Sequence, residues 1–407
     1  HIPSPGNTKS FLILMLILET GMIGTFVAQD LILFFVFFEV VLLPMFFMIA
    51  VWGGDDRRYA SLKFFLYTLF GSALMLLGFL ALFFLAKDPV TGEFLRTFDM
   101  RELTDTAGAG IARSSQLLIF GGMFIGFGVK VPMFPFHTWL PDAHTQAPTQ
   151  GSVILAAVLL KLGTYGFIRI SIPMLPEAAE AWAPVIGLLA VIGIIYGALG
   201  CLAQTDMKRM VAYSSVGHMG YVLLAAAAAT PLGLMGALFQ MVSHGLISGV
   251  LFLVVGVVYA KTGTRDLNVL RGLLNPQRGL PLTGSLMIIG VMASAGIPGM
   301  AGFISEFLIF RGSLQPFPLA TLLSMVGSGL TAVYFLLLVN RAFFGRLAIA
   351  PGEVVNPRIL DRVALREQAP AIALSLGVLV LGLAPELLSN LSEAATTGLS
   401  LITGDLS

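Results

Sequence analysis

The sequence predicts an all-α polytopic membrane protein. Hydrophobic residues make up 57% of the 407 residues and charged residues only 11%, whereas charged residues are about 25% of a soluble domain. The mean hydropathy is +0.91. Apolar runs of about 20 residues, the length that crosses a bilayer as a helix, recur with no polar linker domain between them. We therefore expect a single transmembrane domain over residues 1–407.

Each of these runs predicts one spanning helix, because each is long and apolar enough to cross the hydrocarbon and none shows a strand-and-turn rhythm. About 11 transmembrane helices are expected at this spacing. Their ranges are 10–29, 31–51, 60–86, 114–131, 150–170, 183–203, 209–229, 232–260, 281–311, 318–345 and 369–392.

Two of the predicted helices carry a Gly or Pro interruption beside a charged residue. Lys130 is followed by Val-Pro-Met, and Gly296-Ile-Pro-Gly precedes Glu306. Broken helices of this kind expose backbone groups that can solvate an ion or a proton-carrying water. We therefore expect both interruptions to lie at functional positions.

The two interruptions also predict an internal repeat. Glu39 precedes Lys130 by nearly the same interval as His218 precedes Glu306, and an odd number of spans separates equivalent helices, so the second unit would be inverted in the membrane. This gives two inverted five-helix halves, at about 10–171 and 183–345, and a C-terminal helix at about 369–392. The alternative is coincidence among few charges.

Six ionisable side chains lie inside the apolar segments and are the candidate proton-transfer residues. A charged side chain at the bilayer centre costs roughly 2.5–3.5 kcal/mol even on insertion scales, so such residues usually serve transport. They are Glu39, Lys130, Lys161, His218, His244 and Glu306.

Each candidate has a structural alternative. Glu39 and Lys130 form either a proton-loading pair or a static ion pair, and Lys161 either takes up and releases a proton or stays bound to backbone carbonyls. His218 and His244 have hydroxyl and small neighbours and titrate near neutrality, so they are relay candidates or ordinary hydrogen-bonded histidines. Glu306 is a candidate terminal acceptor or a structural residue.

A second polar group lies near the end of a span. His137, Asp142 and His144 could hold zinc, but their spacing fits no helical or finger site, so a hydrogen-bonded entrance or a rigid turn is the better interpretation. We expect no metal site. Cys201 has no CxxC partner and is expected to be a packing residue.

Basic residues predict the orientation. Most of the 23 lysines and arginines fall in loops on the side of Arg57, Lys208 and Arg265, and the positive-inside bias makes that side cytoplasmic. We therefore expect His1 in the cytoplasm and Ser407 outside. The chain begins with His1 rather than methionine and has no signal-peptide layout, so a trimmed N-terminus is expected. Nothing in the charge indicates a nucleic-acid partner.

Four motifs give the chain a specific resemblance. They are KVPMFPFHTWLPDAHTQAPTQGSVILAAVLLKLGTYGFIRI at 130–170, DMKR at 206–209 followed by AYSSVGHMGY, FFEVVLLPMF around Glu39, and GFISEF around Glu306. With these motifs the chain resembles the antiporter-like M subunits (NuoM, ND4-type) of bacterial NADH:quinone oxidoreductase, respiratory complex I. The resemblance covers almost the whole chain.

The resemblance implies a fold of 14 transmembrane helices, of which this chain supplies helices 4–14. It implies that the six candidate residues move a proton, coupled to NADH oxidation and quinone reduction in other subunits. It also implies antiporter-like L and N type neighbours and no cofactor in this chain, with FMN, iron–sulfur clusters and quinone in partner subunits. Glutamate at position 306 favours the M type over related subunits.

Two other functions remain open from the sequence. Subunits of multisubunit Na⁺/H⁺ antiporters, of membrane-bound hydrogenases and of the photosynthetic NDH complex share this fold, so a cation/proton antiporter module is one alternative. The other is an inert membrane spacer whose buried charges only hold helices together. Exchanging Glu39 and Lys130 distinguishes an inert spacer from a proton pump, because a spacer should tolerate the exchange in activity as well as in assembly.

Overall fold

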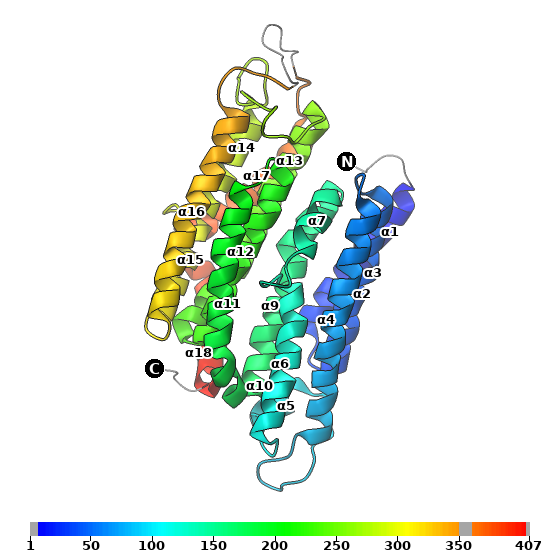
Figure 1. Cartoon of the computed structure of the whole chain (residues 1–407), viewed down its shortest axis with the longest axis vertical. Coiled ribbons are helices and arrows are strands. Elements are labelled where there is room, and N and C mark those ends of the chain that lie inside the picture. Colours follow the sequence, from blue (N-terminus) through cyan, green and yellow to red (C-terminus); the bar gives the residue numbers. More distant parts are fainter. Residues whose placement is uncertain (1–6, 350–359, 404–407) are drawn as a thin grey trace.

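The computed structural model describes residues 7–349 and 360–403, and within these ranges the chain is helical with no strand. Figure 1 shows long helices packed side by side along the longest axis of the molecule. In the described part of the chain, nine segments are long and apolar enough to cross a membrane. The all-α polytopic class is therefore confirmed. His1 and Ser407 lie outside the described residues.

Seven of these nine segments are single helices or a helix pair with one joint. Their bounds are α1 Thr8–Val27, α2 Leu31–Val40 with α3 Leu42–Trp52, α4 Arg57–Leu85, α11 Pro176–Leu202, α12 Met207–Ala228, α13 Pro231–Thr262 and α16 Pro318–Phe343.

The eighth segment, Thr149–Met174, contains two stretches of wider π-helix. It comprises α8 Thr149–Ile154, η1 Leu155–Leu159, α9 Leu160–Gly166, η2 Phe167–Ser171 and α10 Ile172–Met174. A π-helical turn leaves backbone carbonyls without their regular partners, and such turns are frequent at functional sites. The sequence pattern predicted the span but not these turns.

The predicted spans at 114–131 and 281–311 are interrupted as expected. The first is α6 Arg113–Lys130, a turn, and α7 Trp139–Gln146; the second is α14 Pro281–Ser294, a turn, and α15 Ala301–Ser313. Prolines within each turn remove backbone donors. At Gly296 the backbone takes φ +68°, a conformation that favours glycine.

The predicted C-terminal helix at 369–392 is wrong in its bounds. The ninth apolar segment is α17 Leu365–Leu383, and a separate helix, α18 Glu386–Thr403, follows it. Pro385 separates the two, and a residue before proline avoids the helical conformation. Apolar content alone did not reveal this joint. A further short helix, α5 Met100–Thr106, lies in the loop between α4 and α6.

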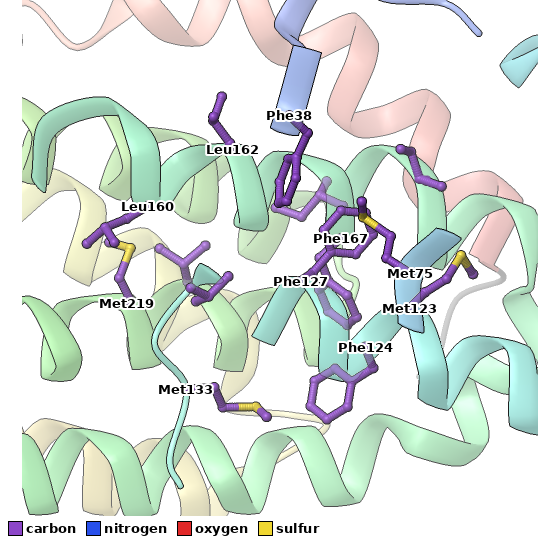
Figure 2. Packing of buried hydrophobic residues seen from close by; sticks show 14 of the residues in the cluster. Phe38, Met75, Met123, Phe124, Phe127, Met133, Leu160, Leu162, Phe167 and Met219 are labelled. Carbon is purple, nitrogen blue, oxygen red and sulfur yellow. The ribbon is translucent and has the colours of Figure 1, made fainter. Parts of the chain in front are cut away.

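The core of the molecule joins the two predicted halves. Figure 1 places α1–α10 in one group and α11–α17 in another, with α12 and α13 turned towards the first group. α12 contacts α7, and α13 contacts both α8 and η1. The spanning window of α12 is 94% buried. Figure 2 shows part of the apolar packing, in which Phe38 and Phe127 from α2 and α6 meet at ring centroids 6.2 Å apart.

Candidate functional site

Glu39 and Lys130 lie close together at one end of the site. Lys130 is the last residue of α6 and is 2% exposed, and its ammonium lies 4.7 Å from the centre of the Phe38 ring. Glu39 interacts electrostatically with Lys130 and lies near the Ser72 hydroxyl, which donates to the carbonyl of Leu69 at 3.1 Å. Among the described residues the two charges form no ion pair within 4.0 Å. Glu39 and Lys130 thus attract each other without direct contact between their charged atoms, and the ammonium rests on an aromatic face.

Lys161 occupies the centre of the site, between the two π-helical stretches. It is 4% exposed, and its Nζ donates to the carbonyl of Ala156, 2.6 Å away, inside η1. The same Nζ lies 2.6 Å from Nδ1 of His244 on α13. The π-helical turn thus supplies one partner for the Lys161 ammonium, the Ala156 carbonyl of the same segment. The second partner is the titratable His244 ring from the other predicted half.

His244 and His218 continue the site into the second half. Nε2 of His244 lies 3.2 Å from the Ser215 hydroxyl, and the two imidazole rings are 5.4 Å apart. His218 binds Ser294 through Nε2 at 2.8 Å and the Gln240 amide through Nδ1 at 3.2 Å. Each ring therefore has polar partners on both nitrogens, which is what a proton relay through imidazole requires.

Glu306 is connected to the histidines by a small cavity beside a row of hydrogen-bonded polar side chains. The Gln240 carbonyl oxygen accepts from the Ser305 hydroxyl at 2.5 Å. Glu306 is 4% exposed and accepts from Ser328 of α16 at 2.6 Å. A cavity of about 10 Å³ is lined by His218, His244, Gln240, Ser294 and Glu306, among others. That volume is close to what one water needs.

The structure thus forms two groups from the six predicted residues. Lys161, His218, His244 and Glu306 share one set of contacts, while Glu39 and Lys130 share another. α9 packs directly on α6, since a Cβ at Gly163 would lie 3.0 Å from the Lys130 Cβ. Apolar side chains lie at this junction, since a Cβ at Gly163 would also meet Val131 at 2.9 Å and one at Gly166 would meet the Phe127 ring. No described hydrogen bond links the two ammonium groups. Their proton-transfer roles remain a prediction.

The polar group at 137–144 is divided between different surroundings. Asp142 forms ion pairs with Lys63 at 2.8 Å and Arg209 at 3.5 Å. His144 is fully buried and stacks on Phe252, while His137 packs between Phe134 and Tyr196. In the described part of the chain no three His, Cys, Asp or Glu side chains are close enough together to hold a metal ion.

The sequence pattern missed one buried ionisable residue, Lys208. It was assigned to a loop on the basic side, but it is the second residue of α12 and only 5% exposed. The DMKR motif stands at the start of an apolar run, so its lysine falls in the first helical turn. Burial there depends on α7 packing across α12, which only the tertiary structure reveals.

A bundle of membrane-spanning helices, two of them broken, around a buried series of lysine, histidine and glutamate defines an antiporter-like membrane subunit. The model for the family described as "NADH:quinone oxidoreductase/Mrp antiporter, TM" matches residues 28–331. The chain belongs to this family.

Curated relatives agree with this assignment. The chain is 44% identical over 389 residues to NADH-quinone oxidoreductase subunit M of Rhodobacter capsulatus, covering 95% of this chain and 74% of the relative. It is 41% identical over 399 residues to NAD(P)H-quinone oxidoreductase chain 4 1 of Synechococcus sp. (strain JA-3-3Ab), covering 96% and 73%.

Solved structures show the same fold. A chain of respiratory complex I from Thermus thermophilus with bound NADH matches with a TM-score of 0.88 and 30% identity, over 97% of this chain and 80% of that one. A chain of the Mrp complex from Dietzia sp. DQ12-45-1b matches with a TM-score of 0.81 and 24% identity, over 97% and 79%. At that identity the Mrp match supports the fold only.

Proposed function

We propose that this chain is a proton-translocating, antiporter-like membrane subunit of an NADH:quinone oxidoreductase. The observation that supports this proposal most strongly is the buried contact between Lys161 Nζ and His244 Nδ1, which are 2.6 Å apart. It joins a titratable amine of the first half to an imidazole of the second. A proton leaving Lys161 passes to His244, then through the polar side chains around His218 to Glu306. Glu39 sets the charge beside Lys130 at the other end. This chain takes no part in the redox chemistry, which belongs to partner subunits with their FMN, iron–sulfur clusters and quinone.

The partners and orientation form part of the same proposal. Relatives named as subunits of quinone oxidoreductases and structures of multisubunit membrane complexes support other membrane subunits as partners. We place antiporter-like L and N type neighbours beside it in the bacterial inner membrane, with the side of Arg57 and Arg265 cytoplasmic. The inverted halves at 10–171 and 183–345 are supported by the two broken helices, α6–α7 and α14–α15.

The test removes the central amine in the assembled complex. Lys161→Ala should reduce NADH-driven proton pumping in inverted membrane vesicles at least about tenfold, since a positioned acid–base group contributes about a hundredfold or more to a proton transfer. Lys9→Ala, an exposed lysine at the start of α1, is the matched control and should pump normally. Normal pumping by the Lys161 variant would refute the proposal.

A second pair of variants separates pumping from a spacer role. Exchanging the charges, with Glu39→Lys and Lys130→Glu together, keeps the net charge but moves the carboxylate onto the Phe38 face and the amine beside Ser72. A spacer tolerates this exchange in both assembly and activity. A proton route loses activity while the complex still assembles, measured as vesicle pumping against the amount of complex on a native gel.

A further inference from the structure

Gln240 is a buried amide on α13 that hydrogen-bonds two neighbouring helices with its two ends. It is only 2% exposed. Its Nε2 lies 3.2 Å from Nδ1 of His218 on α12, and its Oε1 accepts from the Ser305 hydroxyl of α15 at 2.5 Å and from Ser243 at 3.3 Å. The amide nitrogen only donates and the amide oxygen only accepts. Gln240 therefore joins His218 to the helix that carries Glu306 through bonds of opposite polarity.

This contact fixes where the neutral His218 ring carries its hydrogen. Because Nε2 of Gln240 donates, Nδ1 of His218 accepts and has no hydrogen of its own. The hydrogen of the neutral ring then stands on Nε2 of His218, which lies 2.8 Å from the Ser294 hydroxyl. In this arrangement the ring cannot take a second proton on Nε2, and it can release the one there only by becoming an anion.

A charged His218 is incompatible with the same arrangement. The imidazolium ring donates from both nitrogens, so the hydrogen on Nδ1 would face the N–H group of Gln240. A buried charged donor without an acceptor is strongly disfavoured. Half a turn of the amide about its last side-chain bond removes the conflict, because it places Oε1 of Gln240 against Nδ1 of His218.

The groups on the other side of Gln240 accommodate this half turn. After it, Nε2 of Gln240 faces Ser305, whose hydroxyl must accept where it previously donated. Ser305 has another acceptor for its own hydrogen, the Gly302 carbonyl at 2.9 Å. The Ser243 hydroxyl lies 3.1 Å from that of Ser305 and can donate to it instead of to Gln240. Both orientations of the amide thus have hydrogen-bond partners at each end without any movement of the backbone.

We propose that Gln240 is a positioning residue whose amide orientation determines whether His218 can carry a proton. The donating amide allows only the neutral ring with its hydrogen on Nε2. The accepting amide stabilises the hydrogen on Nδ1, so Nε2 becomes the atom that takes up and releases the proton. The released proton passes to a water in the cavity lined by His218, Gln240 and Glu306, and from that water to a Glu306 carboxylate oxygen. The inference rests on the proposed function and adds control of one of its steps.

The other titratable groups around His218 act on it in a different way. They are Lys161 from α9, His244 from α13, Glu306 from α15 and Tyr221, three residues further along α12. Their charges act on the ring in both orientations of the amide. In the described part of the chain, however, the partner of Nδ1 is Gln240 and none of these groups. The amide therefore determines which nitrogen holds the proton.

A purely structural role for Gln240 makes a different prediction. In that case the side chain only fills its space and accepts from Ser305, which ties α13 to α15. Glutamate has nearly the same shape and accepts equally well, so it satisfies this role. A carboxylate has no hydrogen to donate to Nδ1, however, and its charge favours the protonated ring.

The experiment measures NADH-driven pumping by Gln240→Glu in inverted vesicles, per amount of assembled complex and over a range of pH. Control by the amide predicts pumping at least about tenfold slower than in the wild type near neutral pH. The rate should recover several-fold as the pH of the medium is raised, because His218 beside a carboxylate gives up its proton only at higher pH.

Ser305→Ala is the second variant, and it decides alone if the glutamate variant does not assemble. It removes the hydroxyl that accepts from the turned amide, so pumping should slow several-fold. Ser375→Ala on α17 is the matched control, because Ser375 is also buried and donates to its own helix, at the Ala371 carbonyl 2.8 Å away. The control should pump normally.

Three results would overturn the inference. They are normal pumping by Gln240→Glu, slow pumping by this variant with the pH profile of the wild type, and pumping by Ser305→Ala equal to that of Ser375→Ala. The Lys161→Ala variant keeps the two proposals apart. If it fails to pump while Gln240→Glu pumps normally, the role of the amide is wrong and the proposed function stands.

Discussion

Lys161 and Lys208 share one way of holding a buried ammonium. Each donates to the carbonyl of an alanine at a place where a helix departs from regular geometry, Ala156 in the π-helical turn η1 and Ala147 in the turn between α7 and α8. Such carbonyls are short of partners in their own helix. A carbonyl solvates an amine without neutralising it, so this bonding is compatible with either charge state of both lysines.

Gly296 offers a test at the scale of one residue. Its backbone has φ +68°, and a Cβ at this position would lie 2.8 Å from Oε2 of Glu306. Gly296→Ala should therefore push the carboxylate away from Ser328 and slow NADH-driven pumping by about tenfold, since small misplacements of reacting groups cost up to about a hundredfold. Gly345→Ala shares the positive φ but has no neighbour within 4 Å, so it controls for backbone strain, which costs about 1–2 kcal/mol. Equal pumping by both variants would contradict this reading.

At the scale of the helices, the sequence predicted those features that depend on apolar composition and on the positions of glycine and proline. The apolar spans and both interruptions were found because Gly and Pro stand beside Lys130 and Glu306 in otherwise apolar runs. The π-helical turns around Lys161 were missed, since they depend on tertiary packing rather than on a residue type. The joint at Pro385 was missed because apolar residues continue on both sides of it. Lys208 was misjudged because its burial comes from α7, far away in the sequence.

Gly245 controls how closely α13 approaches η1. It follows His244, and a Cβ there would lie 2.9 Å from the carbonyl oxygen of Ala157, a backbone atom that cannot turn aside. Gly245→Ala should lengthen the contact between Lys161 and His244 and reduce pumping by about tenfold, while the complex still assembles.

The control for this variant is on the same helix. Gly249→Ala would meet only the mobile end of the Leu374 side chain, which can move aside, so we expect near-normal pumping per assembled complex. If Gly249→Ala lowers pumping as much as Gly245→Ala does, then general loosening of α13, and not the distance to Lys161, determines the rate.

At the scale of the whole molecule, the polar interior crosses the boundary between the two predicted halves. Half one contributes Lys161 and His144, half two contributes His244, His218 and Lys208, and the hydrogen bonds between them are buried. Apolar packing dominates the junction between α6 and α9 instead. Under the proposed function, proton movement between the two groups requires a change in that packing, whereas the route from Lys161 to Glu306 runs through the contact with His244 and a small cavity that both histidines and Glu306 line.

The chemistry of this interior predicts which ion moves. Hard cations such as Na⁺ need several oxygen ligands at once, but the central groups of this chain are amines and imidazoles, and the carboxylates of Glu39 and Glu306 belong to separate groups of contacts. NADH-driven charge movement should therefore proceed at the same rate when all Na⁺ in the vesicle medium is replaced by K⁺. The measurement is the initial rate of vesicle acidification in the two media, with the Lys161→Ala variant as the baseline. A rate that falls to that baseline without Na⁺ and recovers on its addition would identify the chain as a sodium-coupled antiporter module.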